Sequence, residues 1–339
     1  MRAYFLRRLL LIPPTLVGIT LIVFFITRIV PGGPLEQALM RAQMSLGGAA
    51  SARAGAQGTA LSSDQIEQLK HYYGFDRPWP VAYVQWLGKV ATGNLGTSYR
   101  YNEPVWDLIA ERFPISLFYG GITLVVTFGV CIPLGILKAI RHNTWVDTVS
   151  SILIFVGYAV PGYILAALLL VFFAAKLGWF PLGGFVSDGF SGLSFLGKVG
   201  DLVHHAVLPL ICYLVGSFAF VTLLMKNHLL DNLAADYMRT AVAKGVPGRK
   251  AVLTHALRNS LIPLATAFGQ SVTLLVSGSF LIETIFDIDG VGLLGYTSVL
   301  DRDYPVILGE LLITALVILL GNILSDVLVA LTDPRVKFS

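Results

Sequence analysis

Long apolar runs recur along the chain, and a polar segment separates each run from the next. Six of these runs are long enough to cross a bilayer as a helix, which needs about 20 predominantly apolar residues. The pattern predicts an all-α integral membrane protein with six transmembrane helices. The predicted spans are Leu9–Val30, Ile115–Leu137, Thr148–Ala175, Leu202–Met225, Leu261–Ile282 and Val306–Leu331.

The polar segments between the runs suggest how the chain is organised. Residues 1–30 form a terminus and the first helix, residues 31–114 an external segment, residues 115–331 a five-helix core with a polar loop at 227–260, and residues 332–339 a tail. Within the external segment, Arg41–Ala60 is rich in Ala, Gly and Ser and predicts a flexible loop. Ser62 or Ser63 then caps a short helix with Ile66, Leu69 and Tyr73 on one face.

Composition supports the membrane assignment. Hydrophobic residues make up 55% of the chain, charged residues 13%, and the mean hydropathy is +0.74. A soluble domain carries about 25% charged residues. Cys131 and Cys212 both fall within apolar runs, which is typical of small buried side chains and does not support a disulfide framework.

The distribution of positive charge predicts the orientation. Arg2, Arg7 and Arg8 precede the first run, whose far end offers no small-residue cleavage site, so this run is predicted to be a retained anchor. With alternating spans, the same side receives Lys138, Arg141, the loop 227–260, Arg335 and Lys337. We therefore expect both termini inside and residues 31–114 outside.

The loop between the fourth and fifth spans predicts a helix, a sharp break and a second helix. It carries Lys226, Arg239, Lys244, Arg249, Lys250 and Arg258, with His255, against only Asp231 and Asp236. Asp231 is predicted to cap the first helix, which Leu233, Tyr237 and Ala241 continue. Gly245 is expected in the left-handed conformation that ends a helix, Pro247 follows the break, and the second helix runs through Lys250, Leu253 and Leu257.

The same loop resembles a known motif. Arg239-Thr240-Ala241-x-x-x-Gly245, then His255-Ala256-Leu257-Arg258-Asn259 and Ile262-Pro263, is similar to the EAA loop of importer-type ABC permeases, in its oligopeptide and dipeptide permease variant. The leading Glu of the family is Arg239 here, and its first Ala is Thr240. The resemblance implies a type I ABC importer permease fold and a coupling helix that fits a cleft in an ATPase subunit. The residues it assigns to coupling are Arg239, Thr240, Ala241, Lys244 and Gly245. A solvated amphipathic hairpin is the alternative.

Similarity to peptide permeases extends over nearly the whole chain. In the external segment it rests on Gly74-Phe75-Asp76-Arg77-Pro78 and Gly93-Asn94-Leu95-Gly96-Thr97-Ser98; a purely structural cap is the alternative there. Pro31-Gly32-Gly33-Pro34, Gly157–Pro161, Gly292–Tyr296 and Arg302–Pro305 resemble the Yej-type branch, which implies oligopeptides and microcin C as substrates. The family implies a second homologous permease, ATPase domains and a periplasmic peptide-binding protein in the bacterial inner membrane.

Motifs for chemistry on this chain are incomplete. Gly192–Val199 nearly matches a phosphate-binding loop, but Val199 replaces the Ser or Thr that would reach Mg²⁺. Gly290-Val-Gly292-Leu-Leu-Gly295 matches a dinucleotide fingerprint but follows a membrane span, so a tight re-entrant turn is favoured. His204 and His205 are adjacent and diverge on a helix. We therefore expect no catalytic residue, metal site or cofactor here, with ATP and Mg²⁺ bound by a partner ATPase.

Polar side chains inside the last two spans permit two interpretations. Thr266, Gln270, Thr273 and Ser277 form a stripe on the fifth span; Thr314, Gly321, Asn322 and Ser325 lie together on the sixth, with Asp326 beside them. They either make hydrogen bonds between helices or line a hydrated path for a polar peptide. The predicted path residues are Thr266, Gln270, Thr273, Ser277 and Asn322.

Two other functional classes remain as alternatives. A secondary transporter driven by an ion gradient predicts internal repeats and a functional acid near the midplane, and neither is evident in the sequence. A membrane-embedded enzyme requires a catalytic cluster near one interface.

Overall fold

The computed structural model describes residues 2–40, 63–72 and 74–332. Every regular element in these residues is a helix, apart from one isolated antiparallel bridge between Thr97 and Pro104. Five helices are long and apolar enough to cross a membrane, and a bent pair adds a sixth span if it is counted as one. The prediction of an all-α membrane fold is therefore confirmed. The predicted flexible loop Arg41–Ala60, the cap residue Ser62, Tyr73 and the tail beyond Thr332 lie outside the described residues.

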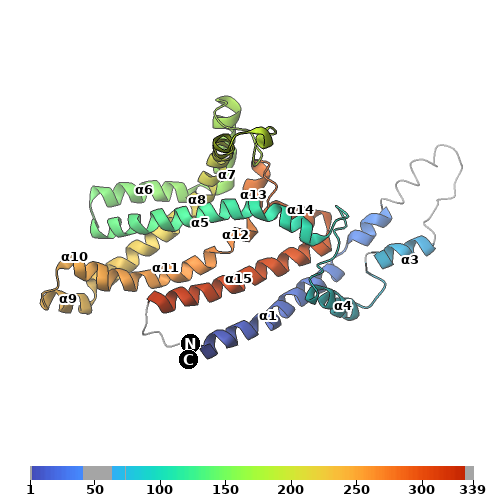
Figure 1. The fold of residues 1–339 in the computed structure, drawn as a ribbon, viewed down its shortest axis with the longest axis horizontal. Coiled ribbons are helices and arrows are strands. Elements are labelled where there is room, and N and C mark those ends of the chain that lie inside the picture. Colours follow the sequence, from blue (N-terminus) through green and yellow to red (C-terminus); the bar gives the residue numbers. More distant parts are fainter. Residues whose placement is uncertain (1, 41–62, 73, 333–339) are drawn as a thin grey trace. The chain divides into compact units, whose positions relative to one another are not determined.

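Figure 1 shows the helices in chain order. Short π-helical stretches, Leu170–Lys176 and Val252–Ala256, follow α7 and α10, and a 3-10 turn, Phe190–Gly192, precedes α8. The α-helices are α1 (Arg2–Ile29), α3 (Ser63–Tyr72), α4 (Trp79–Ala91), α5 (Val105–Ile140), α6 (Trp145–Ala159), α7 (Gly162–Leu169), α8 (Phe195–Ala234), α9 (Asp236–Ala243), α10 (Gly248–Ala251), α11 (Leu257–Ser271), α12 (Leu274–Ser277), α13 (Phe280–Ile285), α14 (Val291–Asp301) and α15 (Tyr304–Thr332).

The chain divides into two compact units. The first consists of Met1–Leu10, Arg112–Leu294 and Thr314–Ser339; the second consists of Leu11–Glu111 and Gly295–Ile313. The first unit has two hydrophobic cores along α5 and α8, one around Tyr119, Cys212, Tyr213 and Phe286 and the other around Cys131, Met225, Leu229 and Met238. The second unit has a smaller core of Phe24, Tyr83 and Leu308.

The predicted third span, Thr148–Ala175, is not one straight helix. It consists of α6 and the helix from Gly162 to Lys176, which meet at 89°. Val160 is extended, with φ −91° and ψ 116°, because the ring of Pro161 disfavours the α conformation in the residue before it. Pro161 also lacks an N–H to continue the helix.

The predicted fourth span is longer than expected, and this overturns the predicted cap at Asp231. Helix α8 has 40 residues and continues to Ala234, so Asp231 lies inside it. Leu229 is fully buried in the core, which keeps this end of α8 helical. The break comes instead at Ala235, whose ψ is 148°.

The fifth span is interrupted near its end. Gly278 has φ +54° and ψ −156° and separates α12 from α13. The glycine-rich segment that follows is not a tight turn as predicted, because Val291 already begins the 11-residue helix α14. The chain between α11 and α15 is therefore divided into three shorter helices, α12, α13 and α14.

Candidate functional site

Helix α9 is a short amphipathic helix with most of its surface exposed. Arg239 and Thr240 are exposed, and the Arg239 guanidinium lies 3.6 Å from the carboxylate of Asp236. Met238 is the anchor: it is buried in the core that also contains Met225 and Leu229 of α8. The structure thus places the predicted coupling residues on α9 and the turn that follows it. Ala241 is partly buried and packs against the same core.

The end of α9 has the geometry expected from the sequence. Gly245 is left-handed, with φ +85°. Its N–H donates to the carbonyl of Val242 (2.9 Å), and the N–H of Val246 donates to the carbonyl of Ala241 (3.1 Å). These two hydrogen bonds form a Schellman motif. A Cβ at Gly245 would meet no atom within 4 Å, so the backbone conformation alone, and not crowding, favours glycine.

A polar node ties α9 to α8 and α11. The Asn232 side-chain N–H donates to the carbonyl of His228 (2.7 Å) and to Ser260 Oγ (3.1 Å). Tyr237 of α9 donates its hydroxyl to Asn232 Oδ1 (2.5 Å). Ser260 is fully buried and donates to the carbonyl of Ala256 (2.7 Å). The hairpin is therefore held by side chains as well as by its core anchor.

The second helix of the predicted hairpin is the beginning of the fifth span. Helix α10, the π-helical stretch Val252–Ala256 and α11 follow one another without a break from Gly248 to Ser271. Arg258 Nε donates to the carbonyl of Thr332 at the end of α15 (2.7 Å). The hairpin is therefore connected directly to two membrane helices, α11 and α15.

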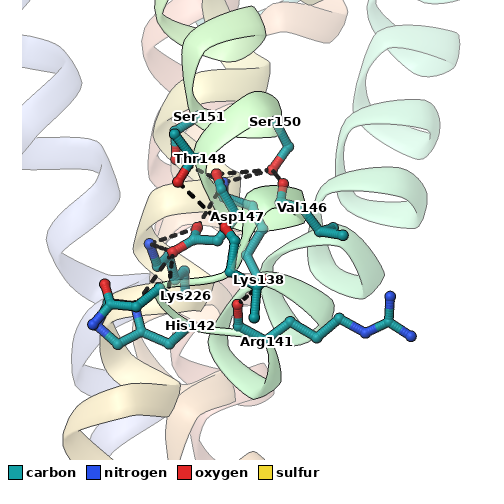
Figure 2. A network of polar contacts seen from close by, with 11 residues as sticks. Lys138, Arg141, His142, Val146, Asp147, Thr148, Ser150, Ser151 and Lys226 are labelled. Carbon is teal, nitrogen blue, oxygen red and sulfur yellow. Dashed lines mark hydrogen bonds and ion pairs between the residues drawn. The ribbon is translucent and has the colours of Figure 1, made fainter.

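An ionic cluster lies where the end of α5 and the start of α6 meet α8 (Figure 2). Asp147 accepts hydrogen bonds from Lys226 Nζ at both carboxylate oxygens (2.7 and 2.8 Å), and its Oδ1 lies 3.0 Å from Lys138 Nζ. Lys138 is fully buried and also donates to Ser150 Oγ and Ser151 Oγ, both at 2.8 Å. We call this the Asp147 cluster: Lys138, Asp147, Ser150, Ser151 and Lys226.

A second polar cluster surrounds a buried acid that the sequence analysis did not single out. Glu283 Oε1 accepts from the Tyr213 hydroxyl (3.2 Å) and the Ser279 N–H (3.1 Å), and Oε2 accepts from the Leu293 N–H (2.7 Å). A Cβ at Gly278, Gly290 or Gly292 would crowd this carboxyl group. We call Tyr213, Ser279, Glu283 and Leu293 the Glu283 clasp. It joins α8 to both sides of the break before α14.

Both clusters could have been suspected from one signal. Asp147 and Glu283 each lie one residue outside a predicted span, Thr148–Ala175 and Leu261–Ile282, and an acid at the border of an apolar run is costly unless it is paired. In the sequence, Lys138 served to predict the orientation, and Asp147 was not among the predicted functional residues. The Glu283 clasp was not predicted because two of its hydrogen-bond donors are backbone N–H groups, which no residue pattern reveals.

The predicted path residues of the fifth span lie on α11, on α12 and in the turn of helical backbone angles that joins them. Thr266 and Gln270 are exposed on α11, whereas the helix is interrupted by a turn at Val272 and Thr273 before Ser277. On α15, Gly321 and Ser325 pack closely against Gly269, where a Cβ would collide with both. Gly321 and Ser325 therefore serve helix packing, while Asn322 is half-buried beside them. A path role for Thr266, Gln270, Thr273, Ser277 and Asn322 stays a prediction.

Other polar residues singled out in the sequence have local partners. Asp326 of α15 forms an ion pair with Arg8 and accepts from the Tyr4 hydroxyl (2.9 Å). His204 Nε2 lies 2.7 Å from the carbonyl of Trp179, and His205 Nδ1 lies 2.9 Å from the carbonyl of Asp201. The two histidines thus engage different backbone groups.

Comparison with known proteins identifies the family. Residues 131–338 match the model described as "Binding-protein-dependent transport system inner membrane component". Over its full length the chain is 38% identical to the peptidoglycan transport system permease protein YejB of Agrobacterium fabrum, covering 99% of that protein. It is 37% identical to the inner membrane ABC transporter permease protein YejB of Escherichia coli O157:H7, again covering 99%, and 33% identical to the oligopeptide transport system permease protein AppB of Bacillus subtilis, covering 100%. The chain belongs to the family of binding-protein-dependent inner membrane components, the permease subunits of ABC importers.

Proposed function

We propose that this chain is one of two permease subunits that enclose a path for peptides across the bacterial inner membrane. ATP and Mg²⁺ are bound on partner ATPase domains, and a periplasmic binding protein delivers the peptide. Both termini and α9 face the cytoplasm. The full-length similarity to relatives named for peptide, oligopeptide and dipeptide transport supports the substrate class.

The observation that carries the proposal is the protruding α9 hairpin. An exposed helix of eight residues, ended by a Schellman motif and anchored through Met238, is a preformed knob that can enter a groove without first becoming ordered. Preorganisation lowers the entropic cost of docking. Arg239, Thr240, Ala241, Lys244 and Gly245 form the docking surface in this proposal.

The path is proposed to follow the exposed polar side of α11. Thr266 and Gln270 offer hydrogen-bond donors and acceptors that can replace water around a peptide backbone without presenting a fixed charge. Asn322 would contribute from α15. Peptidoglycan fragments that contain a peptide are a second candidate substrate, because one relative is named for peptidoglycan transport.

Reconstitution tests the proposal. The complete importer, purified with its ATPase and permease partners, is placed in proteoliposomes with its binding protein and labelled tripeptide. We expect uptake that requires ATP and binding protein and is unaffected when a proton gradient is collapsed. Uptake that follows a proton gradient without ATP would contradict the proposal. Competition by muramyl peptides, compared with free tripeptides, distinguishes the two substrate candidates.

A further inference from the structure

The Asp147 cluster lies on the helix that carries the α9 hairpin. Lys226 belongs to α8, which continues without interruption from the cluster to Ala234, and the break at Ala235 then starts α9. Ala234 lies eight positions after Lys226, so the distance is about 12 Å at 1.5 Å per residue. Any rotation of α8 at Lys226 is therefore passed to α9 through a short stretch of helix.

The backbone of α8 touches α5 one helical turn from the cluster. A Cβ at Gly135 would lie 2.6 Å from Met225 Cβ and 2.8 Å from the Thr222 carbonyl oxygen. Because such approach leaves no room for a side chain, the separation of the two helices is fixed at this point. The buried Met225 and Leu229 side chains pack α8 into its core without a directional preference, and a hydrogen-bonded ion pair adds a directional restraint on its rotation and sliding.

Lys226 supplies that contact. Lys138 is already held by acceptors from the start of α6: the Asp147 carbonyl (2.9 Å), Ser150 Oγ and Ser151 Oγ. The α5–α6 corner is therefore satisfied without α8. The hydrogen bonds from Lys226 to both carboxylate oxygens of Asp147 fasten α8 to this corner. The Lys226 side chain is 12% exposed, so solvent competes little for it.

We infer that Lys226 is a positioning residue that fixes the rotation and depth of the α8 end, and through it the orientation of α9. The functional consequence rests on the proposed coupling role of α9; the positional consequence does not. Loss of Lys226 leaves the Lys138–Asp147 pair neutral and buried, so this loss should loosen α9 without exposing an unpaired charge in the core.

The test measures position and transport in the same complete importer. Spin labels are placed at exposed Leu153 of α6 and exposed Val242 of α9, and their distance distribution is measured by double electron–electron resonance. Lys226→Met is compared with Lys226→Arg, which keeps the charge, and with Lys198→Met, the same substitution near the other end of α8. Peptide uptake per ATP hydrolysed is measured for each variant.

The expected result is an approximately twofold broadening of the distance distribution in Lys226→Met with at least a fivefold fall in uptake per ATP. Lys198→Met should match the wild type, and Lys226→Arg should recover a narrow distribution. An unchanged distribution in Lys226→Met overturns the inference. A broadened distribution with unchanged uptake per ATP supports the positioning role and overturns the coupling role proposed for α9.

A second variant covers failure of Lys226→Met to assemble. Asp147→Glu keeps every charge but adds a methylene between the helix and the carboxylate that Lys226 contacts. It should shift the Leu153–Val242 distance while the importer still assembles. An unshifted distance in assembled Asp147→Glu overturns the inference.

Discussion

The Asp147 cluster and the Glu283 clasp both fasten α8 to other helices through a buried acid, but they balance its charge differently. Two lysines surround Asp147, one of them fully buried. Within the part of the chain that the structure describes, the Glu283 carboxyl group accepts only from a tyrosine hydroxyl and two backbone N–H groups. One junction is ionic, and the other is a set of hydrogen bonds to neutral donors.

The difference predicts unequal tolerance to losing the acid. Removal of the charge at position 147 leaves two ammonium groups facing each other, and an uncompensated buried charge is among the most destabilising changes known in proteins. Replacement of the Glu283 carboxyl group by an amide leaves a neighbouring N–H donor without its acceptor, which costs less.

Asp147→Asn should have the largest effect. We expect a loss of stability of about 3–5 kcal/mol because Lys138 and Lys226 lose their shared counter-charge. Assembled importer should be scarce after purification, and its thermal unfolding midpoint should fall. Asp188→Asn, at an exposed position between α7 and α8, is the control. A normal yield and a normal unfolding midpoint for Asp147→Asn would show that the Asp147 cluster does not stabilise the protein.

Glu283→Gln should have a smaller effect. The amide keeps one acceptor oxygen but turns a donor toward either the Ser279 or the Leu293 N–H, which costs about 1–3 kcal/mol. The importer should assemble with a moderately lower unfolding midpoint. Glu67→Gln on the exposed face of α3 is the matched control. A loss of stability as large as that of Asp147→Asn would contradict the proposed difference between the two junctions.

Gly245→Val should disturb the hairpin alone. A β-branched residue in the left-handed conformation costs about 1–2 kcal/mol and should tilt or fray the end of α9. We expect insertion to survive, while transport, substrate-stimulated ATP hydrolysis and retention of the ATPase fall together. Gly248→Val is the control, because Gly248 lies outside the left-handed region and a Cβ there meets nothing within 4 Å. Wild-type transport by an assembled Gly245→Val importer would contradict the coupling role.

Gln270→Leu with Thr273→Leu should have the smallest effect on stability, within about 0.5 kcal/mol, because Gln270 is exposed and makes no core contact. Peptide uptake should nevertheless fall several-fold if these residues line the path. Val299→Leu on the exposed surface of α14 is the control. Loss of assembly without a selective transport defect would favour hydrogen bonding between helices instead.

Local signals in the sequence predicted the parts of this molecule that depend on local physics. Apolar runs located the spans because lipid requires length and hydrophobicity of each helix separately. Gly245 and Pro247 located the end of α9 because left-handed backbone and a missing N–H act within a few residues. The predicted helix start at Asp231 was wrong because the capping tendency of Asp is a local preference. The buried Leu229 and Met225 keep α8 helical through packing against residues distant in the sequence.

The two clusters depended on contacts between distant residues. Asp147 and Lys226 are 79 positions apart, and Tyr213 and Glu283 are 70 apart. Hydropathy shows that a charge at the border of an apolar run needs a partner but not which partner. The Glu283 clasp was harder still, since the Ser279 N–H is available only because the helix breaks at Gly278, and the Leu293 N–H only because Leu293 lies in the first turn of α14.

The right-angled break between α6 and α7 restricts what can surround this chain in the membrane. The last carbonyls of α6 and the first N–H groups of α7 have no partners within their own helices. Hydrocarbon cannot supply such partners, and each unsatisfied group costs several kcal/mol there. Phe155, Tyr158 and Tyr163 beside the break are 50%, 60% and 45% exposed, so this chain alone does not cover it. At hydrocarbon depth, this corner needs water or another polypeptide of the assembled importer beside it to satisfy its remaining backbone groups.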